Sequence, residues 1–232
     1  MLIRRLALFG LAAIVSHALA ADRQEAFRLY DLALRHEFAR EYKEARAQFE
    51  ASLASARAAG LGPSFESAAT YNLARMVGYT CDFERANELL LEALELEQGL
   101  PRPNPGNLTK RVSELARLSF DRGQFAESAT YYEQVIPELV RLGVLRQDPI
   151  GFAALLDDYA LAESRAGNEA SAQEARARSA SIRSENPGKN AQFVPVHYRE
   201  ACPQAKSSNM TVDTDVLTAG FRQPIARRSL PR

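Results

Sequence analysis

The sequence predicts an all-α protein, built as an array of about four antiparallel helix pairs and followed by an irregular C-terminal tail. Three observations predict this class. Four segments repeat one pattern at offsets of 41, 42 and 44 residues. Apolar residues recur at every third or fourth position within each segment, as on the buried stripe of a helix. No stretch before residue 190 alternates as a strand would. A fixed period of this length is typical of arrays whose units stack on one another.

The first 20 residues predict a secretory signal rather than part of the array. Arg4 and Arg5 are followed by an apolar run from Leu6 to Val15 and by small residues up to Ala20. This basic, apolar, small order is typical of a cleaved signal, and the run is shorter than the roughly 20 residues that span a bilayer. The alternative is an uncleaved anchor. We expect export to the bacterial periplasm or secretion, a mature start at Ala21, and no membrane span after the signal is removed.

Residues 21–185 form the predicted helical repeat domain. Each of its four copies carries two small residues twelve positions apart. The pairs are Ala33 and Ala45, Ala74 and Ala86, Ala116 and Ser128, and Ala160 and Ala172. A small residue on each facing surface lets two helices approach closely, because a larger side chain would wedge them apart. The pairs therefore predict a helix, a tight turn and a second helix in each copy.

Helix boundaries are predicted by capping residues. Asp22, with Glu25 three residues later, fits the start of the first helix, and Asp148 followed by Pro149 fits the start of a later one. Glycines follow the second helices of the first three copies, at Gly60, Gly99 and Gly143. The proline-rich stretch of residues 100–107 is predicted as loop.

The fourth copy departs from the pattern of the first three. Glu169 and Arg176 stand where the other copies carry aromatic or apolar residues. A terminal repeat with a polar outer face would show such departures. The alternative is that the fourth copy is not a true repeat.

The leucine, first small residue, aromatic and second small residue of each copy resemble the tetratricopeptide repeat (TPR) family over residues 21–185. The period exceeds the usual 34 residues and is similar to the longer variant of kinesin light chain arrays. The resemblance implies a right-handed superhelix in which the first helix of each pair lines a concave groove. It also implies that a protein or peptide binds in this groove.

Mapping the repeat onto the chain predicts partner-binding residues on the middle first helices. They are Tyr71, Asn72, Arg75, Lys110, Glu114 and Arg117. Asn72 and Lys110 coincide with two positions of the carboxylate clamp that some family members use, but Glu114 has the wrong sign for an anionic ligand, so no clamp is predicted. The alternative for any one of these residues is an ordinary solvated helix face.

The predicted function is a non-catalytic adaptor or scaffold. The alternative is an accessory or assembly subunit of a cell-envelope enzyme or secretion complex, and an enzyme is a distant third. Lys plus Arg and Asp plus Glu balance at 29 each, which argues against nucleic acid as partner. No cofactor, metal site or catalytic residue is predicted. The one conceivable catalytic pair is His197 with Cys202, which would act as base and nucleophile.

Residues 186–232 are predicted to be an irregular or partly disordered tail, because Pro187 breaks the helical period. The tail could also lie along the last repeat, or fill the groove as an intramolecular ligand. The sequence has two cysteines, Cys81 in the turn of the second copy and Cys202 in the tail. Export favours a disulfide between them, and free thiols are the alternative.

Overall fold

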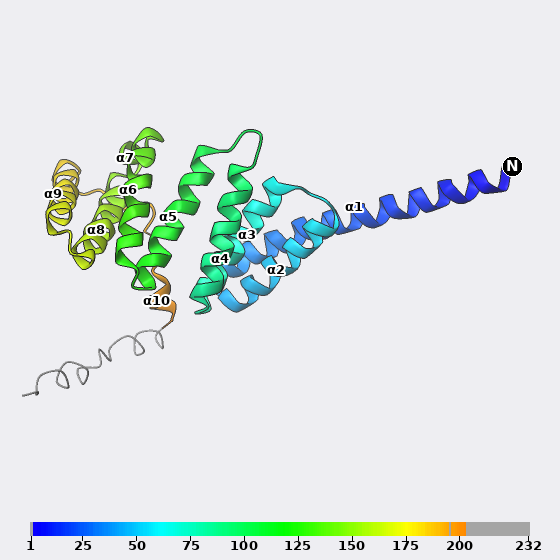
Figure 1. Ribbon diagram of the computed structural model, residues 1–232, viewed down its shortest axis with the longest axis horizontal. Coiled ribbons are helices and arrows are strands. Elements are labelled where there is room, and N and C mark those ends of the chain that lie inside the picture. Colours follow the sequence, from blue (N-terminus) through cyan, green and yellow to red (C-terminus); the bar gives the residue numbers. More distant parts are fainter. Residues whose placement is uncertain (1, 195, 203–232) are drawn as a thin grey trace, which may run out of the picture.

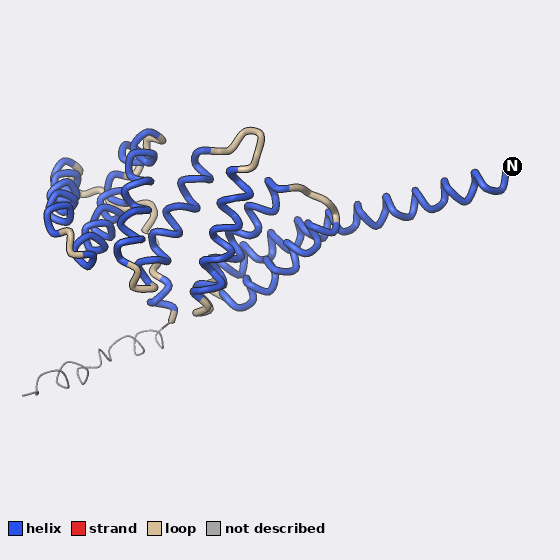
Figure 2. Tube along the Cα trace, in the orientation of Figure 1, coloured by secondary structure: helices blue, strands red, loops and turns tan. Residues whose placement is uncertain are grey.

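The protein is a stack of helix pairs. The computed structural model describes residues 2–194 and 196–202, with side chains from residue 20 onward. Its helices are α1 (Leu2–Phe38), α2 (Tyr42–Ala58), α3 (Pro63–Tyr79), α4 (Phe83–Gln98), α5 (Pro105–Asp121), α6 (Phe125–Arg141), α7 (Val144–Gln147), α8 (Pro149–Ala166), α9 (Glu169–Glu185) and α10 (Tyr198–Ala201). Within these residues the chain forms helices and loops and no strand (Figure 2).

Four antiparallel pairs stack in chain order (Figure 1). They are α1 with α2, α3 with α4, α5 with α6, and α8 with α9, and each second helix packs on the first helix of the next pair. The short helix α7 lies in the connection between the third and fourth pairs. The predicted all-α array of four pairs is therefore confirmed.

The small residues that define the repeat lie at the crossing of each pair. All eight are buried, with at most 1% of their surface exposed. Ser128 is the one polar member, and its hydroxyl donates a 2.7 Å hydrogen bond to the carbonyl oxygen of Ala116, its partner twelve residues earlier. A buried hydroxyl needs such a partner, so the serine replaces alanine without leaving a polar group unsatisfied.

Serine hydroxyls also join the two helices of three pairs at a second crossing point. Ser52 of α2 donates to the carbonyl oxygen of Ala26, and Ser179 of α9 donates to that of Ala153 in the equivalent place. In the second pair the direction is reversed, since Ser67 of α3 donates to the carbonyl oxygen of Ala93. These bonds fix the register of each pair without the bulk of a larger side chain.

Most predicted helix boundaries are confirmed. Asp148 accepts a 2.9 Å hydrogen bond from the Gly151 amide and caps α8. The three glycines predicted to follow second helices lie just beyond α2, α4 and α6.

Two boundary predictions are wrong. The loop of residues 100–107 is shorter than predicted, because Asn104 caps α5 and Pro105 occupies its first position, where a missing amide costs nothing. Asp22 caps no helix in the full chain, because α1 continues through it from the N-terminal segment.

The fourth pair is a regular helix pair, as its buried Ala160 and Ala172 show. Its two departures from the pattern, Glu169 and Arg176, lie on the exposed side of α9 and form a 2.7 Å ion pair with each other. The last helix of the array therefore turns a polar face to water, as a terminal repeat requires.

From residue 186 the described chain is irregular except for the short helix α10. It returns along the array and places α10 beside α5 and α3 (Figure 1). Residues 203–232 of the predicted tail lie outside the described residues. Among the helices that the structure describes, none has the length and apolar character to cross a membrane.

Candidate functional site

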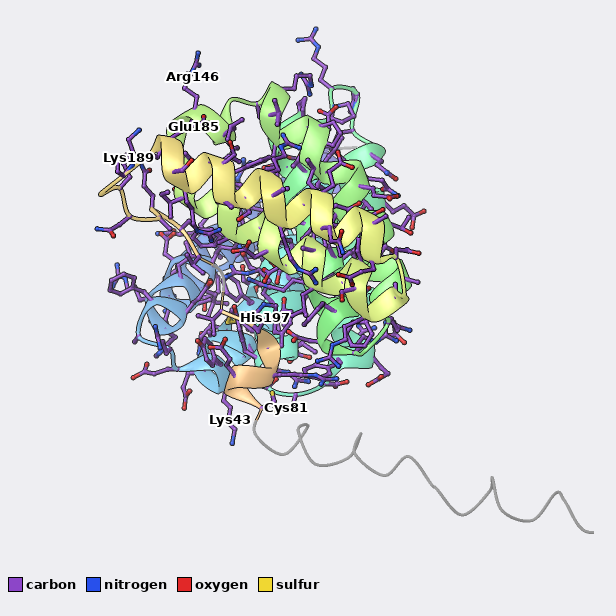
Figure 3. All side chains as sticks on the ribbon, turned by 90° about the vertical axis from the view of Figure 1, so that its left-hand side faces the viewer. Lys43, Cys81, Arg146, Glu185, Lys189 and His197 are labelled. Carbon is purple, nitrogen blue, oxygen red and sulfur yellow. A yellow bond between two sulfur atoms is a disulfide. The ribbon has the colours of Figure 1, made fainter. Side chains whose placement is uncertain are left out.

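The first helices of the four pairs share a face, and a later segment of the chain crosses this face on the last three pairs. We call residues 189–202, of which Pro195 is not described, the strap. The strap contacts Asp158 on α8, Asp121 and Glu114 on α5, and Tyr79 on α3. We call this shared face the inner face. Figure 3 shows Lys189 near the end of α9, and His197 and Cys81 where the strap ends.

A tyrosine anchors the strap. Tyr198 has no exposed surface, and its ring lies 4.7 Å from the Tyr79 ring with the Arg117 guanidinium 5.0 Å above it. Its hydroxyl donates a hydrogen bond to the Glu114 carboxylate. The site depends on Gly78, because a Cβ there would come within 2.5 Å of the Tyr198 ring.

Main-chain groups of the strap bind to side chains of the array, as those of a bound peptide would. The amides of Gln192 and Phe193 each donate to Asp148 Oδ2 at 3.1 Å. The amide of Tyr198 donates to Asp121 Oδ2 at 2.8 Å. The Tyr79 hydroxyl donates to the carbonyl oxygen of Val196 at 3.1 Å. Extended recognition of this kind obtains affinity from main-chain bonds and specificity from side-chain pockets.

Two carboxylates of the inner face flank His197 of the strap. The His197 ring nitrogens lie 3.3 Å from Asp121 Oδ1 and 3.5 Å from Asp158 Oδ1. These two carboxylates, Asp121 first, raise the pKa of His197 to about 10 against the desolvation that lowers it. His197 is therefore protonated at neutral pH. Arg199 donates from Nε to the carbonyl oxygen of Asp121.

Glu114 is the centre of a buried charge cluster beneath Tyr198. Burial raises the pKa of Glu114, but the guanidiniums of Arg117 and Arg75 outweigh it and hold that pKa below its usual range. Arg75 also lies 2.7 Å from Glu37 of α1. The two arginines are thus paired with carboxylates of the array itself, and both carboxylates are largely buried.

A disulfide between Cys81 and Cys202 closes the strap over the inner face, with a Cα–Cα distance of 5.7 Å. Cys202 is fully buried, whereas Cys81 is exposed. Cys81 occupies the turn between α3 and α4 with φ +75°, and the equivalent residues of the other turns are Arg40, Gly123 and Gly167, all with positive φ. Both cysteines of the sequence are in this bond.

Comparisons with known proteins identify the architecture. No protein-family model matches the chain and no curated protein matches it. Among solved structures, BtubC (BKLC) from P. vanneervenii superposes with a TM-score of 0.63 at 20% identity, over 74% of this chain and 70% of that one. The putative kinesin light chain TPR-like repeats of Podosopora anserina give 0.54 at 22% identity, over 81% and 94%. MamA gives 0.54 at 15% identity, over 74% and 85%.

The protein has a TPR-like fold. At these identities the likeness shows the fold alone. Solenoids of this kind have an extended concave surface.

The TPR-like array places the predicted partner-binding residues in three different environments. Lys110 is exposed, Tyr71 and Arg75 are half-buried, and Asn72, Glu114 and Arg117 are buried. Glu114 and Arg117 lie beneath the strap. Carboxylates of the array pair with Arg75 and Arg117, whereas the side chain of Lys110 is exposed.

Sequence reasoning missed the main residues of the strap site. Asp121, Asp148 and Tyr198 carry most of its hydrogen bonds, and Gly78 makes the room for Tyr198. One signal was available. Gly78 stands where the other copies carry Glu37, Phe120 and Ser164, and a glycine inside a helix often marks a close approach.

Part of the inner face stays open beside the strap. Leu34 and Leu161 are the repeat equivalents of Arg75 and Arg117, and they are 40% and 42% exposed. Phe27, the equivalent of Lys110, is 44% exposed. The inner face thus offers apolar side chains of the first and last pairs together with the exposed cation of Lys110.

The tail pair His197 and Cys202 does not form a nucleophilic site in this structure. The Cys202 sulfur is bonded to Cys81, and the His197 ring faces Asp121 and Asp158. In the described part of the chain, no group of three or more His, Cys, Asp or Glu side chains could hold a metal ion.

Proposed function

We propose that this protein is an exported, non-catalytic adaptor that binds a segment of another protein or a peptide along its inner face. The observation that carries the proposal is the strap. The inner face already holds an extended segment through main-chain hydrogen bonds and a buried tyrosine. Apolar side chains of the same face remain exposed, where a partner would extend the buried surface.

Export is part of the proposal and rests on the signal-like N-terminus and on the disulfide. A bond between cysteines is stable in the periplasm or outside the cell and rare in the cytosol. The charge balance of 29 against 29 supports a protein partner over a nucleic acid.

Photocrosslinking in the native compartment tests the proposal. A benzophenone amino acid replaces Leu34 on the inner face in one variant and Leu91 in a matched control. The two leucines are 40% and 43% exposed, but Leu91 belongs to the second helix α4. We expect one discrete adduct from position 34 and none from position 91, with the partner identified by mass spectrometry. Equal adducts from both positions, or none from position 34, would contradict the proposal.

Charge reversal at Lys110 supplies a second test. Lys110→Glu should weaken capture of that partner, whereas Lys43→Glu on the exposed side of α2 should not. Lys110 is a better position for this test than Arg75, because a carboxylate at position 75 would face Glu37 and Glu114 and disturb the fold.

A further inference from the structure

The strap binds the array as a ligand would, and its Tyr198 also packs in the hydrophobic core of the array. Its described residues form no helix or strand except α10, and its main-chain groups bond to the side chains of Asp148, Asp121 and Tyr79. The four pairs close their own crossings with small residues of the array itself. The inner face therefore forms a site for an extended segment, and the chain supplies its own occupant.

We propose that the strap is a resident ligand held in place by the Cys81–Cys202 disulfide, and that reducing this bond opens the site to an extended partner segment carrying a tyrosine between two cations. This inference rests on the proposed function and names the class of partner segment and the condition under which it binds.

The chemistry of the partner follows from the contacts of the strap. The site offers a closed pocket for one tyrosine ring. The Glu114 carboxylate accepts a hydrogen bond from the tyrosine hydroxyl. Asp121 and Asp158 flank that pocket and hold the cation that precedes Tyr198, while the carbonyl oxygen of Asp121 accepts from the cation that follows it. An acidic segment would meet the same carboxylates and be repelled.

The disulfide explains why a partner segment can bind only after the bond is reduced. A tethered ligand acts at an effective concentration on the order of millimolar, and a covalent bond at its far end keeps it from leaving at all. The bond is open to attack from one side, because Cys81 is exposed while Cys202 is buried.

The redox step requires a dithiol reductant. One thiolate of the reductant attacks Cys81 Sγ and forms a mixed disulfide, and Cys202 leaves as a thiolate that takes up a proton. The second thiol of the reductant then attacks its own sulfur in the mixed disulfide and releases Cys81 as a thiol. Two electrons pass to the protein, and the reductant ends as a disulfide.

A labelled copy of the strap tests the inference. The probe is a fluorescein-labelled peptide copying residues 190–204 with Cys202→Ser, and its control carries Tyr198→Ala as well. The proteins are the full mature chain, oxidised or reduced, and a disarmed full chain with Tyr198→Ala and Cys202→Ser. We expect at least tenfold tighter binding of the probe to the disarmed chain than to the oxidised chain, an intermediate affinity after reduction, and no binding of the control peptide.

Gly78→Ala in the disarmed chain is the matched pocket variant. Alanine favours the helix over glycine, but its Cβ would occupy the place of the tyrosine ring. We expect this variant to keep its helicity and to lose at least tenfold in affinity for the probe. Equal binding to the oxidised and disarmed chains, or a helical disarmed chain that binds no probe, would overturn the inference.

A nicked protein decides the question if the disarmed chain does not fold. A protease site inserted at the exposed Lys189 allows the strap to be cut from the folded, oxidised protein. After reduction, the labelled probe should exchange into the site, and without reduction it should not. Failure to exchange after reduction would overturn the inference, while capture of a partner from Leu34 would still uphold the proposed function.

Discussion

His197 shows how the charge of one side chain follows from its neighbours. Asp121 on α5 and Asp158 on α8 lie on either side of its ring and favour the imidazolium. The same two carboxylates belong to different pairs of the array, so the protonated ring joins the third pair to the fourth through the strap. A neutral ring would leave at least one of these carboxylates without its cation.

The raised pKa predicts a pH dependence of stability. The pKa of His197 rises from 6.5 to about 10 on folding, so its stabilising contribution is fully present below pH about 6.5 and is lost as the pH rises through about 10. We expect the unfolding temperature of the oxidised protein to fall between pH 7 and 10. His197→Gln should flatten this decline, since it removes the titrating group. Thermal unfolding followed by circular dichroism checks the prediction, and parallel pH profiles for both proteins would contradict it.

At the scale of the element, small residues decide how closely two helices pack. Ala74 of α3 and Ala86 of α4 are both fully buried, and the repeat places equivalent small residues at each crossing. Ser128 is the one polar residue among them. It is nearly as small as alanine, and its hydroxyl donates a hydrogen bond to the carbonyl oxygen of Ala116 in the same pair. The spacing of twelve residues is thus the number of positions from the small residue on the first helix, through the turn, to the small residue that faces it on the second helix.

Enlarging one of these residues should weaken the pair. Ala86→Leu would force extra methyl groups into a closed crossing, and overpacking of this kind costs about 1–3 kcal/mol. Ala47→Leu on an exposed position of α2 is the control and should leave stability within about 0.5 kcal/mol. Chemical denaturation of both variants measures the difference. Equal stabilities would show that position 86 does not lie at a crossing.

At the scale of the whole molecule, the strap joins parts that the chain keeps far apart. It begins after the last pair, and its disulfide to the turn of the second pair spans 121 residues of sequence. The core of the first two pairs includes Tyr198, so the end of the chain contributes to packing near its beginning. Cooperative unfolding of distant repeats follows from this closure, in contrast to open solenoids whose repeats interact only with neighbours.

The disulfide gives two measurable consequences. The oxidised, denatured protein should show no reactive thiol, and the reduced protein should show two. In the chain-entropy model a closed loop of this length contributes roughly 5 kcal/mol. Cys81→Gly should be less destabilising than Cys202→Ser by about 1 kcal/mol, because glycine adopts the positive φ of this turn without strain. Two reactive thiols without reduction, or a reversed order of the variants, would contradict this account.

Removal of the predicted signal should leave the array intact. Ala26 is the first buried apolar residue described in α1, and it lies after the expected cleavage before Ala21. We expect Edman sequencing of the exported protein to begin at Ala21, and its helix content and thermal unfolding to match those of a chain expressed without residues 1–20. A membrane-bound protein that retains Met1 would refute the predicted cleavage of a secretory signal.

The sequence by itself determined the helix pairs, their order and their crossings. The contacts within each pair join residues within about 30 positions of one another, and the same residue types recur with the period of the repeat. It could not determine which of the predicted groove residues are exposed. Tyr198 lies in a pocket formed by residues of the second and third pairs, and Asp121, Asp148 and Asp158 form one site only because the third and fourth pairs present them to the same segment. Such contacts join positions more than 70 residues apart in the case of Asp121 and Tyr198 and follow no period in the chain. Tertiary structure alone therefore decided that the inner face is acidic where it binds the strap, and that its occupant is residues 189–202 of the same chain.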